Sequence, residues 1–212
     1  MPTPLEVTLS ILFQEPNNIR DKTPYLYNIP ETNLCWLHNC GAGNKSVLKW
    51  LNNEYGSIRR MTKEEVEKNE KDVFVLVAEP EYKWWNGIIE WGTFFDDYAW
   101  FRHDKIMKWW PNFHRFTLAQ WEVIEATKNV KHFIKVGPDL GEKMTTFAKE
   151  HNIKMHGEFP YIKPRWRKVD YIKRMGEALK PELQNMMRRD PALKQQLDDY
   201  LAKDYEYYDK AK

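Results

Sequence analysis

The sequence predicts an α/β domain with a central parallel sheet. Three short apolar runs, Leu34–Leu37, Val73–Val77 and His132–Val136, are each followed by a polar turn and then by apolar residues at helical spacing. The middle run is apolar at every position, which is typical of a strand that helices cover on both faces. Strands that alternate with helices in this way usually pair in parallel.

The region before the first of these strands looks different. Residues 1–30 are predicted to form an irregular N-terminal arm, because prolines recur throughout this stretch. Only the run from Val7 to Phe13 has the composition of a strand. Residues 31–212 are predicted to form a single domain, since a chain of 212 residues is long enough for one full core but short for two.

A helix is expected after each predicted strand. Within Lys45–Tyr55, Trp50 recurs three residues after Val47 on one apolar face. The second and third helices are expected over Tyr82–Trp91 and from Leu140 to Ala148. Each helix would return the chain to the start of the next strand, as a parallel sheet requires.

Two further helical regions are predicted. Residues 63–71 are so rich in charge that their helix is expected to be solvated. From Val169 onward the chain is predicted to be helical, and Pro181 and Pro191 are placed in the first turns of new helices. The domain is therefore expected to end in a helical C-terminal segment.

Composition limits the class of protein. The formal net charge of +2 argues against a general nucleic-acid binder, although basic residues gather between Lys163 and Arg174. No apolar stretch approaches the ~20 residues of a membrane span, and no signal pattern opens the chain. A soluble protein that is not secreted is expected.

The cysteine content points to a reducing compartment. The chain has two cysteines, Cys35 in the first predicted strand and Cys40 in the turn after it. Their placement does not favour a mutual disulfide, and no second pair is present to complete a zinc site. We therefore predict a cytoplasmic protein without a metal centre.

The turn His38–Ser46 is the first candidate site. It is rich in small residues and leads directly into a helix, so its backbone N–H groups would lie at the positive end of the helix dipole, where a phosphate can bind. Alternatively, Gly41 and Gly43 serve only a tight turn. A nucleoside-triphosphate loop is disfavoured, because Asn44 stands where the glycine before its lysine belongs.

Four segments in order match the pattern of one enzyme family. His38–Val47 is similar to His-Ile-Pro-Lys-x-Gly-Gly-Thr-Ser-Leu at a strand–helix junction, and Val73–Asn86 to a buried strand followed by Arg-Asp/Asn-Pro-x-x-Arg-x-x-Ser. Phe133–Leu140 is similar to a strand ending in Glu-x-Leu, and Leu201–Tyr208 to a Tyr-x-x-Asp-Tyr-x-x-Phe helix. Over about residues 30–208 the chain thus resembles the PAPS-dependent sulfotransferases of the carbohydrate-directed branch.

This resemblance implies a P-loop-like three-layer domain that transfers a sulfuryl group from PAPS to a hydroxyl of a carbohydrate or another acceptor. Lys45 and either His103 or His114 as the base are the implied catalytic residues. The implied cofactor-binding residues are Gly41, Ala42, Gly43, Asn44, Lys45 and Ser46 for the 5′-phosphosulfate, and Lys83, Asn86, Arg165, Arg167 and Lys168 for the 3′-phosphate.

Two family positions differ in this chain. The loop lysine that contacts the bridging oxygen falls on Gly41, and the arginine that clamps the 3′-phosphate falls on Ala78. Loss of an Arg–phosphate fork removes an interaction worth roughly 1.5–3 kcal/mol. Lys45 lies close enough in sequence to Gly41 to supply a substitute cation.

The alternative function is a catalytically inactive sulfotransferase fold that serves as a binding or assembly module. In that case the basic stretch 163–174 and a tryptophan-rich surface would bind a protein partner. The tryptophans could instead form a stacking platform for a sugar or pack in the core; the residues concerned are Trp84, Trp85, Trp91, Trp100, Trp109, Trp110 and Trp121.

Overall fold

The structure is a computed structural model of the chain, and it describes residues 23–94, 118–160, 162, 181, 184–185 and 188–212. Its centre is a five-stranded sheet with the strand order β3-β1-β2-β4-β5. The strands are β1 (Tyr25–Asn28), β2 (Leu34–His38), β3 (Arg60–Met61), β4 (Asp72–Val77) and β5 (Val130–Lys135). The domain is therefore α/β, as predicted.

The three predicted strands correspond to β2, β4 and β5, and they pair in parallel. The predicted parallel sheet accounts for these three strands only, because β1 pairs antiparallel with both β2 and β3. The sheet is mixed, with its parallel part on the side of β5.

The prediction of an irregular arm through residue 30 is wrong for Tyr25–Asn28, which form β1. Leu26 is fully buried and lies opposite Leu37 of β2 and Met61 of β3. Pro24 and Pro30 flank this strand and do not interrupt it, which is where a sheet tolerates proline. The run from Val7 to Phe13 lies outside the described residues.

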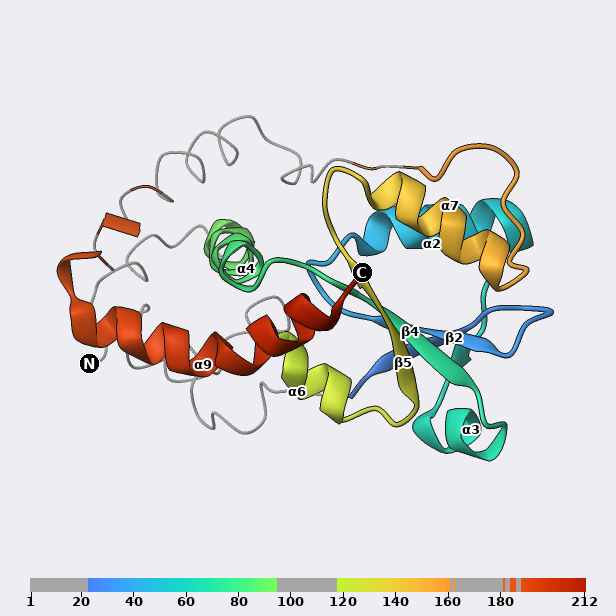
Figure 1. Cartoon of the computed structure of the whole chain (residues 1–212), viewed down its shortest axis with the longest axis horizontal. Helices are drawn as coiled ribbons and strands as arrows, with labels where there is room; N and C mark the ends of the chain where they lie inside the picture. Colours follow the sequence, from blue (N-terminus) through green and yellow to red (C-terminus); the bar gives the residue numbers. More distant parts are fainter. Residues whose placement is uncertain (1–22, 95–117, 161, 163–180, 182–183, 186–187) are drawn as a thin grey trace, which may run out of the picture.

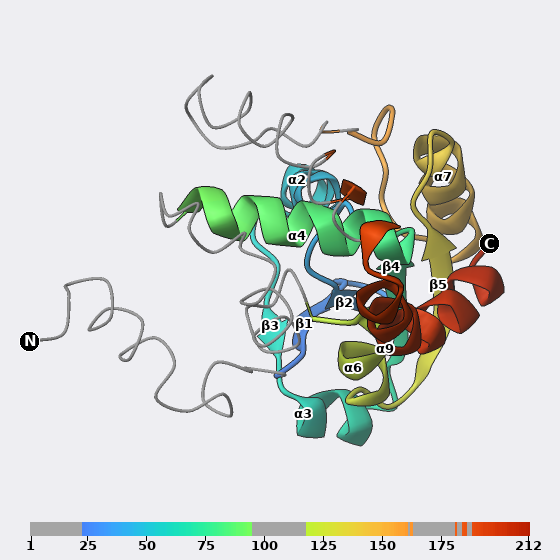
Figure 2. The same ribbon diagram turned by 90° about the vertical axis from the view of Figure 1, so that its left-hand side faces the viewer.

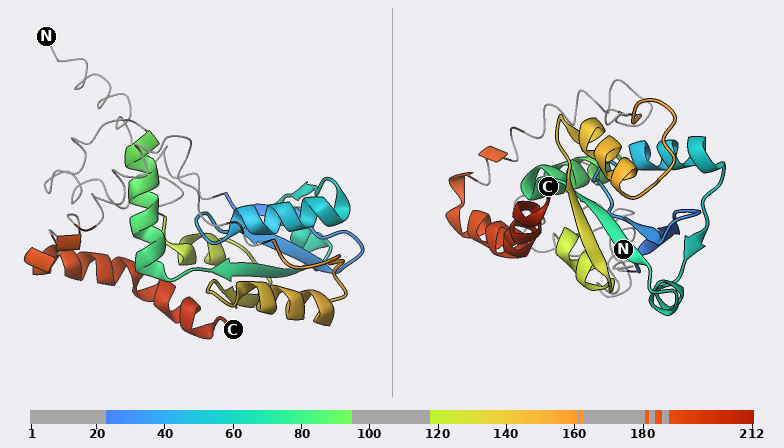
Figure 3. Two further views of the ribbon diagram at one scale, coloured as in Figure 1. Left: turned by 90° about the horizontal axis from the view of Figure 1, so that it is seen from above. Right: turned by 45° about the vertical axis from the view of Figure 1, so that its right-hand side comes forward.

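Helices cover both faces of the sheet (Figures 1 and 2). The helices α2 (Asn44–Tyr55) and α7 (Leu140–Glu150) pack on one face. The other face contacts α3 (Lys63–Lys68), α6 (Gln120–Glu125) and the end of α9 (Pro191–Lys210). The helix α4 (Pro80–Phe94) extends away from the end of β4, and α9 passes its base (Figure 3).

Most helix predictions are confirmed with shifted ends. The helix predicted over Tyr82–Trp91 spans Pro80–Phe94, and Pro191 opens α9 as expected. The charged helix ends at Lys68. The helix α6 was not predicted, and the stretch 163–180 lies outside the described residues.

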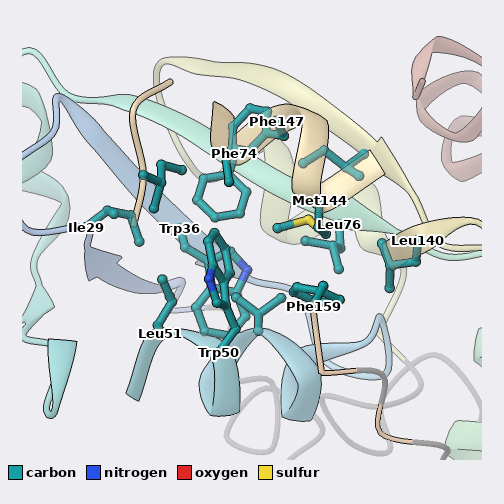
Figure 4. Packing of buried hydrophobic residues seen from close by; sticks show 14 of the residues in the cluster. Ile29, Trp36, Trp50, Leu51, Phe74, Leu76, Leu140, Met144, Phe147 and Phe159 are labelled. Atoms are coloured by element: carbon teal, nitrogen blue, oxygen red, sulfur yellow. The ribbon is translucent and has the colours of Figure 1, made fainter. Parts of the chain in front are cut away.

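Aromatic side chains fill the core beneath α2 and α7 (Figure 4). Trp36 of β2 and Trp50 of α2 are buried, and the rings of Phe74 and Phe147 lie 5.0 Å apart. The indole N–H of Trp50 donates to the carbonyl of Lys154 at 3.2 Å. These contacts hold α2, and with it the turn that precedes α2, against the sheet.

Both cysteines are thiols, as predicted. Cys35 is fully buried in β2, and burial raises the pKa of its thiol to about 12, so this thiol is unreactive. Within the part of the chain that the structure describes, no helix is both long and apolar enough to span a bilayer.

Candidate functional site

The candidate site lies at one edge of the sheet. Because β2 and β4 are parallel neighbours, the turn His38–Ser46 and the turn Ala78–Pro80 leave the sheet at the same, C-terminal edge. Ligands of open α/β sheets bind at this edge. Two of the four segments that carry the resemblance therefore leave the sheet at the same edge.

Two glycines shape the first turn. Gly41 has φ +84° and Gly43 has φ +71°, in the left-handed region that favours glycine. A Cβ on Gly43 would lie 3.2 Å from Leu76 Cδ2 and 3.5 Å from Leu140 Cδ2. The turn is thus packed closely onto β4 and the start of α7, and here the tight-turn role of the glycines is real.

We expect Gly43→Ala to lower the free energy of unfolding by about 1–2 kcal/mol for the left-handed backbone alone, with the close contacts adding to it. Gly141→Ala is the control, because Gly141 lies in α7 with nothing within 4 Å of an added Cβ. That variant should gain up to roughly 1 kcal/mol. Urea denaturation of both variants measures the difference, and equal stabilities would contradict the packing described.

The N-terminus of α2 is open, in the sense that no side chain caps its first N–H groups. Its N-cap, Gly43, provides no side-chain cap, and the first turn holds no acidic residue. Among the described residues, no acceptor meets the backbone N–H groups of Asn44 and Lys45. The Lys45 side chain is exposed, and the buried Oδ1 atom of Asn44 has no hydrogen-bond partner.

Hydrogen bonds from within the protein fix Ala42 and Ser46 in this loop. Ala42 is buried, and its N–H donates to the Asn39 carbonyl at 3.1 Å. The Ser46 hydroxyl is buried and accepts from the Ile162 N–H at 2.9 Å. A hydroxyl can accept and donate at once, so its proton is still available to an anion.

The N-terminus of α4 is closed by its own N-cap. The Glu79 carboxylate accepts from the N–H of Glu81 at 3.3 Å and from the N–H of Tyr82. The Tyr205 hydroxyl donates to the same carboxylate at 3.1 Å. Burial, followed by the nearby Glu79 carboxylate, raises the pKa of Tyr205.

Ala78, at the family's arginine position, is part of the core. It is 3% exposed, and both of its backbone polar groups are bonded to the Gln120 amide. Its N–H donates to Gln120 Oε1 at 2.9 Å, and its carbonyl accepts from Gln120 Nε2 at 2.8 Å.

Lys83, predicted to bind the cofactor, is also inside the protein. It is 3% exposed, and its ammonium donates to the Leu118 carbonyl at 2.7 Å. Its stem runs beneath Gly41, with Cγ 3.2 Å from where a Gly41 Cβ would lie. Burial lowers the pKa of Lys83, and the nearby Asp204 carboxylate works in the opposite direction. This placement disfavours direct contact with a phosphate that arrives from solvent.

A buried polar network joins both turns to α6 and α9. Asn39 Nδ2 donates to the Leu76 carbonyl at 2.9 Å and to Gln120 Oε1 at 2.8 Å. Asp204 accepts from the N–H groups of Gln120 at 2.9 Å and of Trp121 at 2.7 Å, so it caps α6. Burial raises the pKa of Asp204, although Lys83 and these N–H groups counteract it.

Sequence reasoning did not identify Asn39, Gln120 or Asp204 as site residues. Asp204 is the acidic position of the Tyr-x-x-Asp-Tyr-like segment, so that segment held a signal for it. Gln120 has no such signal, because its importance depends on the two strand ends that its amide meets.

The remaining predicted residues are dispersed. Asn86 is half-buried on α4. Trp84 and Trp85 are each 1% exposed with ring centroids 4.8 Å apart, so they pack in the core and offer no platform to a sugar. Trp121 is half-buried and meets the ammonium of Lys203. Outside the described residues or side chains lie His103, His114, Arg165, Arg167, Lys168, Trp91, Trp100, Trp109 and Trp110.

Searches with this chain found no matching family model, no matching curated protein and no matching solved structure. Within the described ranges, no group of three or more His, Cys, Asp or Glu side chains is arranged to hold a metal ion.

Proposed function

We propose that this chain is a sulfotransferase-like protein whose loop 41–46 binds the 5′-phosphate or 5′-phosphosulfate end of a nucleotide such as PAPS. The observation that carries the proposal is the open N-terminus of α2 at the C-terminal edge of the parallel strands. Two of the helices that begin at the same edge, α4 and α6, already have a carboxylate that accepts from their first N–H groups. Glu79 caps α4, and Asp204 caps α6.

Electrostatics favour an anion at the open position. The N-terminus of a helix carries a partial positive charge, so a cation in the first turn is unfavourable unless an anion accompanies it. Lys45 is such a cation, and no acidic side chain shares its turn. A phosphate here would accept from the free N–H groups of Asn44 and Lys45 and would pair with the ammonium.

The four segments behind the resemblance also converge on this loop. Lys83 of the second segment passes under Gly41, and Leu140 of the third lies against Gly43. Asp204 of the fourth lies near enough to Lys83 to influence its pKa. Residues of the second and third segments thus lie against this loop, and a residue of the fourth lies near Lys83, which supports the proposal.

In sulfuryl transfer the acceptor hydroxyl loses its proton to a base while fixed donors stabilise charge on the bridging oxygen. The loop amides, Lys45 and the Ser46 hydroxyl would be those donors. His103 or His114 stays the predicted base.

A second candidate function has support of its own. The part of the predicted cofactor site that would bind the 3′-phosphate has no exposed cation at these two positions. Ala78 is uncharged, and Lys83 is buried. An inactive fold that serves as a binding or assembly module would tolerate this, because it has no leaving group to stabilise.

Calorimetric titration of the full chain with AMP and with PAP, which both carry a 5′-phosphate, tests the proposal. We expect binding that Lys45→Ala weakens about tenfold, equivalent to about 1.4 kcal/mol, because the variant removes one charge-assisted contact. Lys49→Ala is the control, since Lys49 is exposed on the same helix one turn further on.

The control should bind as the wild type does. If neither nucleotide binds at millimolar concentration, the loop is not a phosphate site and the module function is favoured. Equal losses in the two variants would mean that only the general charge of α2 matters.

A further inference from the structure

We propose that Cys40 and His38 form a thiol–imidazole pair, and that the Cys40 sulfur is a site of covalent modification by small disulfides such as oxidised glutathione. His38 is the last residue of β2, and Cys40 lies between the end of that strand and loop 41–46. Sulfuryl transfer, as proposed, makes no use of this thiol. The modification does not depend on the binding of a phosphate by the loop.

The thiol and the imidazole are close enough to interact directly. Cys40 Sγ lies 3.7 Å from His38 Nδ1, which is within hydrogen-bonding range for a sulfur. Both residues are half-buried, so the sulfur lies neither deep in the core nor fully in water. Reactive cysteines typically occupy partly exposed positions beside a histidine or a cation, whereas structural buried cysteines are inert.

Three aromatic rings restrict the imidazole. The ring centroid of His38 lies 6.0 Å from that of Tyr25, 6.3 Å from that of Tyr27 and 5.3 Å from that of Trp36. Trp36 is fully buried, and Tyr25 is paired with His38 across the antiparallel strands β1 and β2. Because the ring is already packed, it loses little conformational entropy when Nδ1 meets the thiol.

A buried cation lies near the same sulfur. The stem of Lys83 comes within 3.2 Å of where a Cβ on Gly41, the residue after Cys40, would lie. Burial lowers the pKa of Lys83, whereas the Asp204 carboxylate and the Cys40 thiolate favour its charged form. Electrostatic coupling of this kind is reciprocal, so the Lys83 ammonium also favours the thiolate form of Cys40.

The reaction is a thiol–disulfide exchange. In the tautomer that carries its hydrogen on Nε2, His38 takes the proton of the Cys40 thiol on Nδ1, and the thiolate attacks one sulfur of the small disulfide. The S–S bond of the reagent breaks as the new S–S bond to Cys40 forms. Cys40 is thereby oxidised to a mixed disulfide, and the other half of the reagent leaves as a thiolate.

The rate at which the full chain reacts with dithiobisnitrobenzoate, a chromogenic disulfide, tests the proposal when it is measured as a function of pH. The native chain should react at one thiol, because Cys35 is fully buried and burial raises the pKa of that thiol to about 12. Cys40→Ser should abolish this reaction. The midpoint of the pH profile should lie about one unit lower for the native chain than for the chain in guanidinium chloride, where the imidazole and the ammonium no longer face the sulfur.

His38→Gln removes the base and keeps a polar side chain in its place. It should move the midpoint toward that of the denatured chain and slow the reaction at neutral pH about threefold, because the thiolate fraction falls while the remaining thiolate becomes more nucleophilic. His156→Gln is the matched control, since the His156 side chain is exposed and pairs with Glu54. The control should react as the wild type does.

Oxidised glutathione, followed by mass mapping of peptides, should add one glutathione to Cys40 and none to Cys35. Reaction of both thiols in the native chain, or of neither, would overturn the site. A native midpoint equal to that of the denatured chain would overturn the activation of Cys40, and this comparison needs no variant. A midpoint left unchanged by His38→Gln, in a variant with the circular dichroism of the wild type, would overturn the role of His38.

Discussion

Replacing Gln120 with alanine is expected to lower the free energy of unfolding by roughly 3–5 kcal/mol. The side chain is fully buried, and its amide is bonded to both backbone groups of Ala78 and to Asn39. Its loss strands a buried N–H and a buried carbonyl, each of which costs about 1–3 kcal/mol without a partner. Chemical denaturation followed by tryptophan fluorescence measures the change.

In Gln120→Glu the side chain keeps nearly the same size and shape, so this variant tests the contribution of the hydrogen bonds apart from that of packing. An ionised carboxylate accepts from the Ala78 N–H but cannot donate to the Ala78 carbonyl, whereas a protonated one can. The folded state therefore favours the proton, and the pKa of the new group is raised above its unfolded value. Stability should be highest below the unfolded pKa of about 4.3 and should fall as pH rises through the folded pKa.

The alanine variant should lack this added pH dependence. A Gln120→Ala variant within 1 kcal/mol of wild type would mean that water replaces the amide, and the network would then be dispensable.

The second large effect is expected for Lys83→Met, which should destabilise the fold by about 3–5 kcal/mol, because it leaves the buried Asp204 carboxylate without a compensating charge. Methionine keeps most of the stem that packs beneath Gly41, so the loss reports on the charge more than on the packing. The free energy of unfolding at neutral pH is the measurement.

The pH dependence of this variant has a definite sign. Burial already raises the pKa of Asp204 in the wild type, and removal of Lys83 removes the main opposing influence. The folded pKa then lies further above the unfolded value of about 3.9, so the variant should be most stable below that pH and should lose stability as pH rises through the folded pKa.

Lys83→Met combined with Asp204→Asn provides the check on that interpretation. The double variant should be more stable than the sum of the two single losses predicts, since the second change removes the stranded charge. Simple additivity would show that the two side chains act independently.

The fold was largely predictable where burial produces a strong local pattern. Val73–Val77 is apolar throughout because helices cover both faces of β4, and the periodic residues of α2 and α7 meet the same core. Tyr25–Asn28 carries a weaker signal, because only Leu26 in it is buried and two prolines flank it. Its strand state depends on pairing with β2 and β3, which no local window contains.

The candidate site was predictable in place but not in detail. The glycines of the loop and the edge of the sheet follow from local rules, and Lys45 is exposed at that edge. The burial of Lys83 does not follow from such rules, because its partners at Leu118 and Asp204 come from distant segments. The same is true of Glu79, whose partner Tyr205 lies 126 residues away.

The capping of α6 by α9 also sets an order of assembly. Gln120 and Asp204 are separated by 84 residues, so the N–H groups at the start of α6 emerge from a ribosome well before their acceptor exists. At a synthesis rate of about 5–20 residues per second, the delay is roughly 4–17 s. During this delay Asp204 is not yet present to accept from the Gln120 N–H. The Gln120 amide, which bonds to Asn39 and Ala78 at the ends of β2 and β4, is therefore not yet fixed in position. Loop 41–46 is thus synthesised early in translation, whereas Asp204, which accepts from the Gln120 N–H, is synthesised late. If the loop binds phosphate as proposed, nascent chains should bind nucleotide only after α9 has docked.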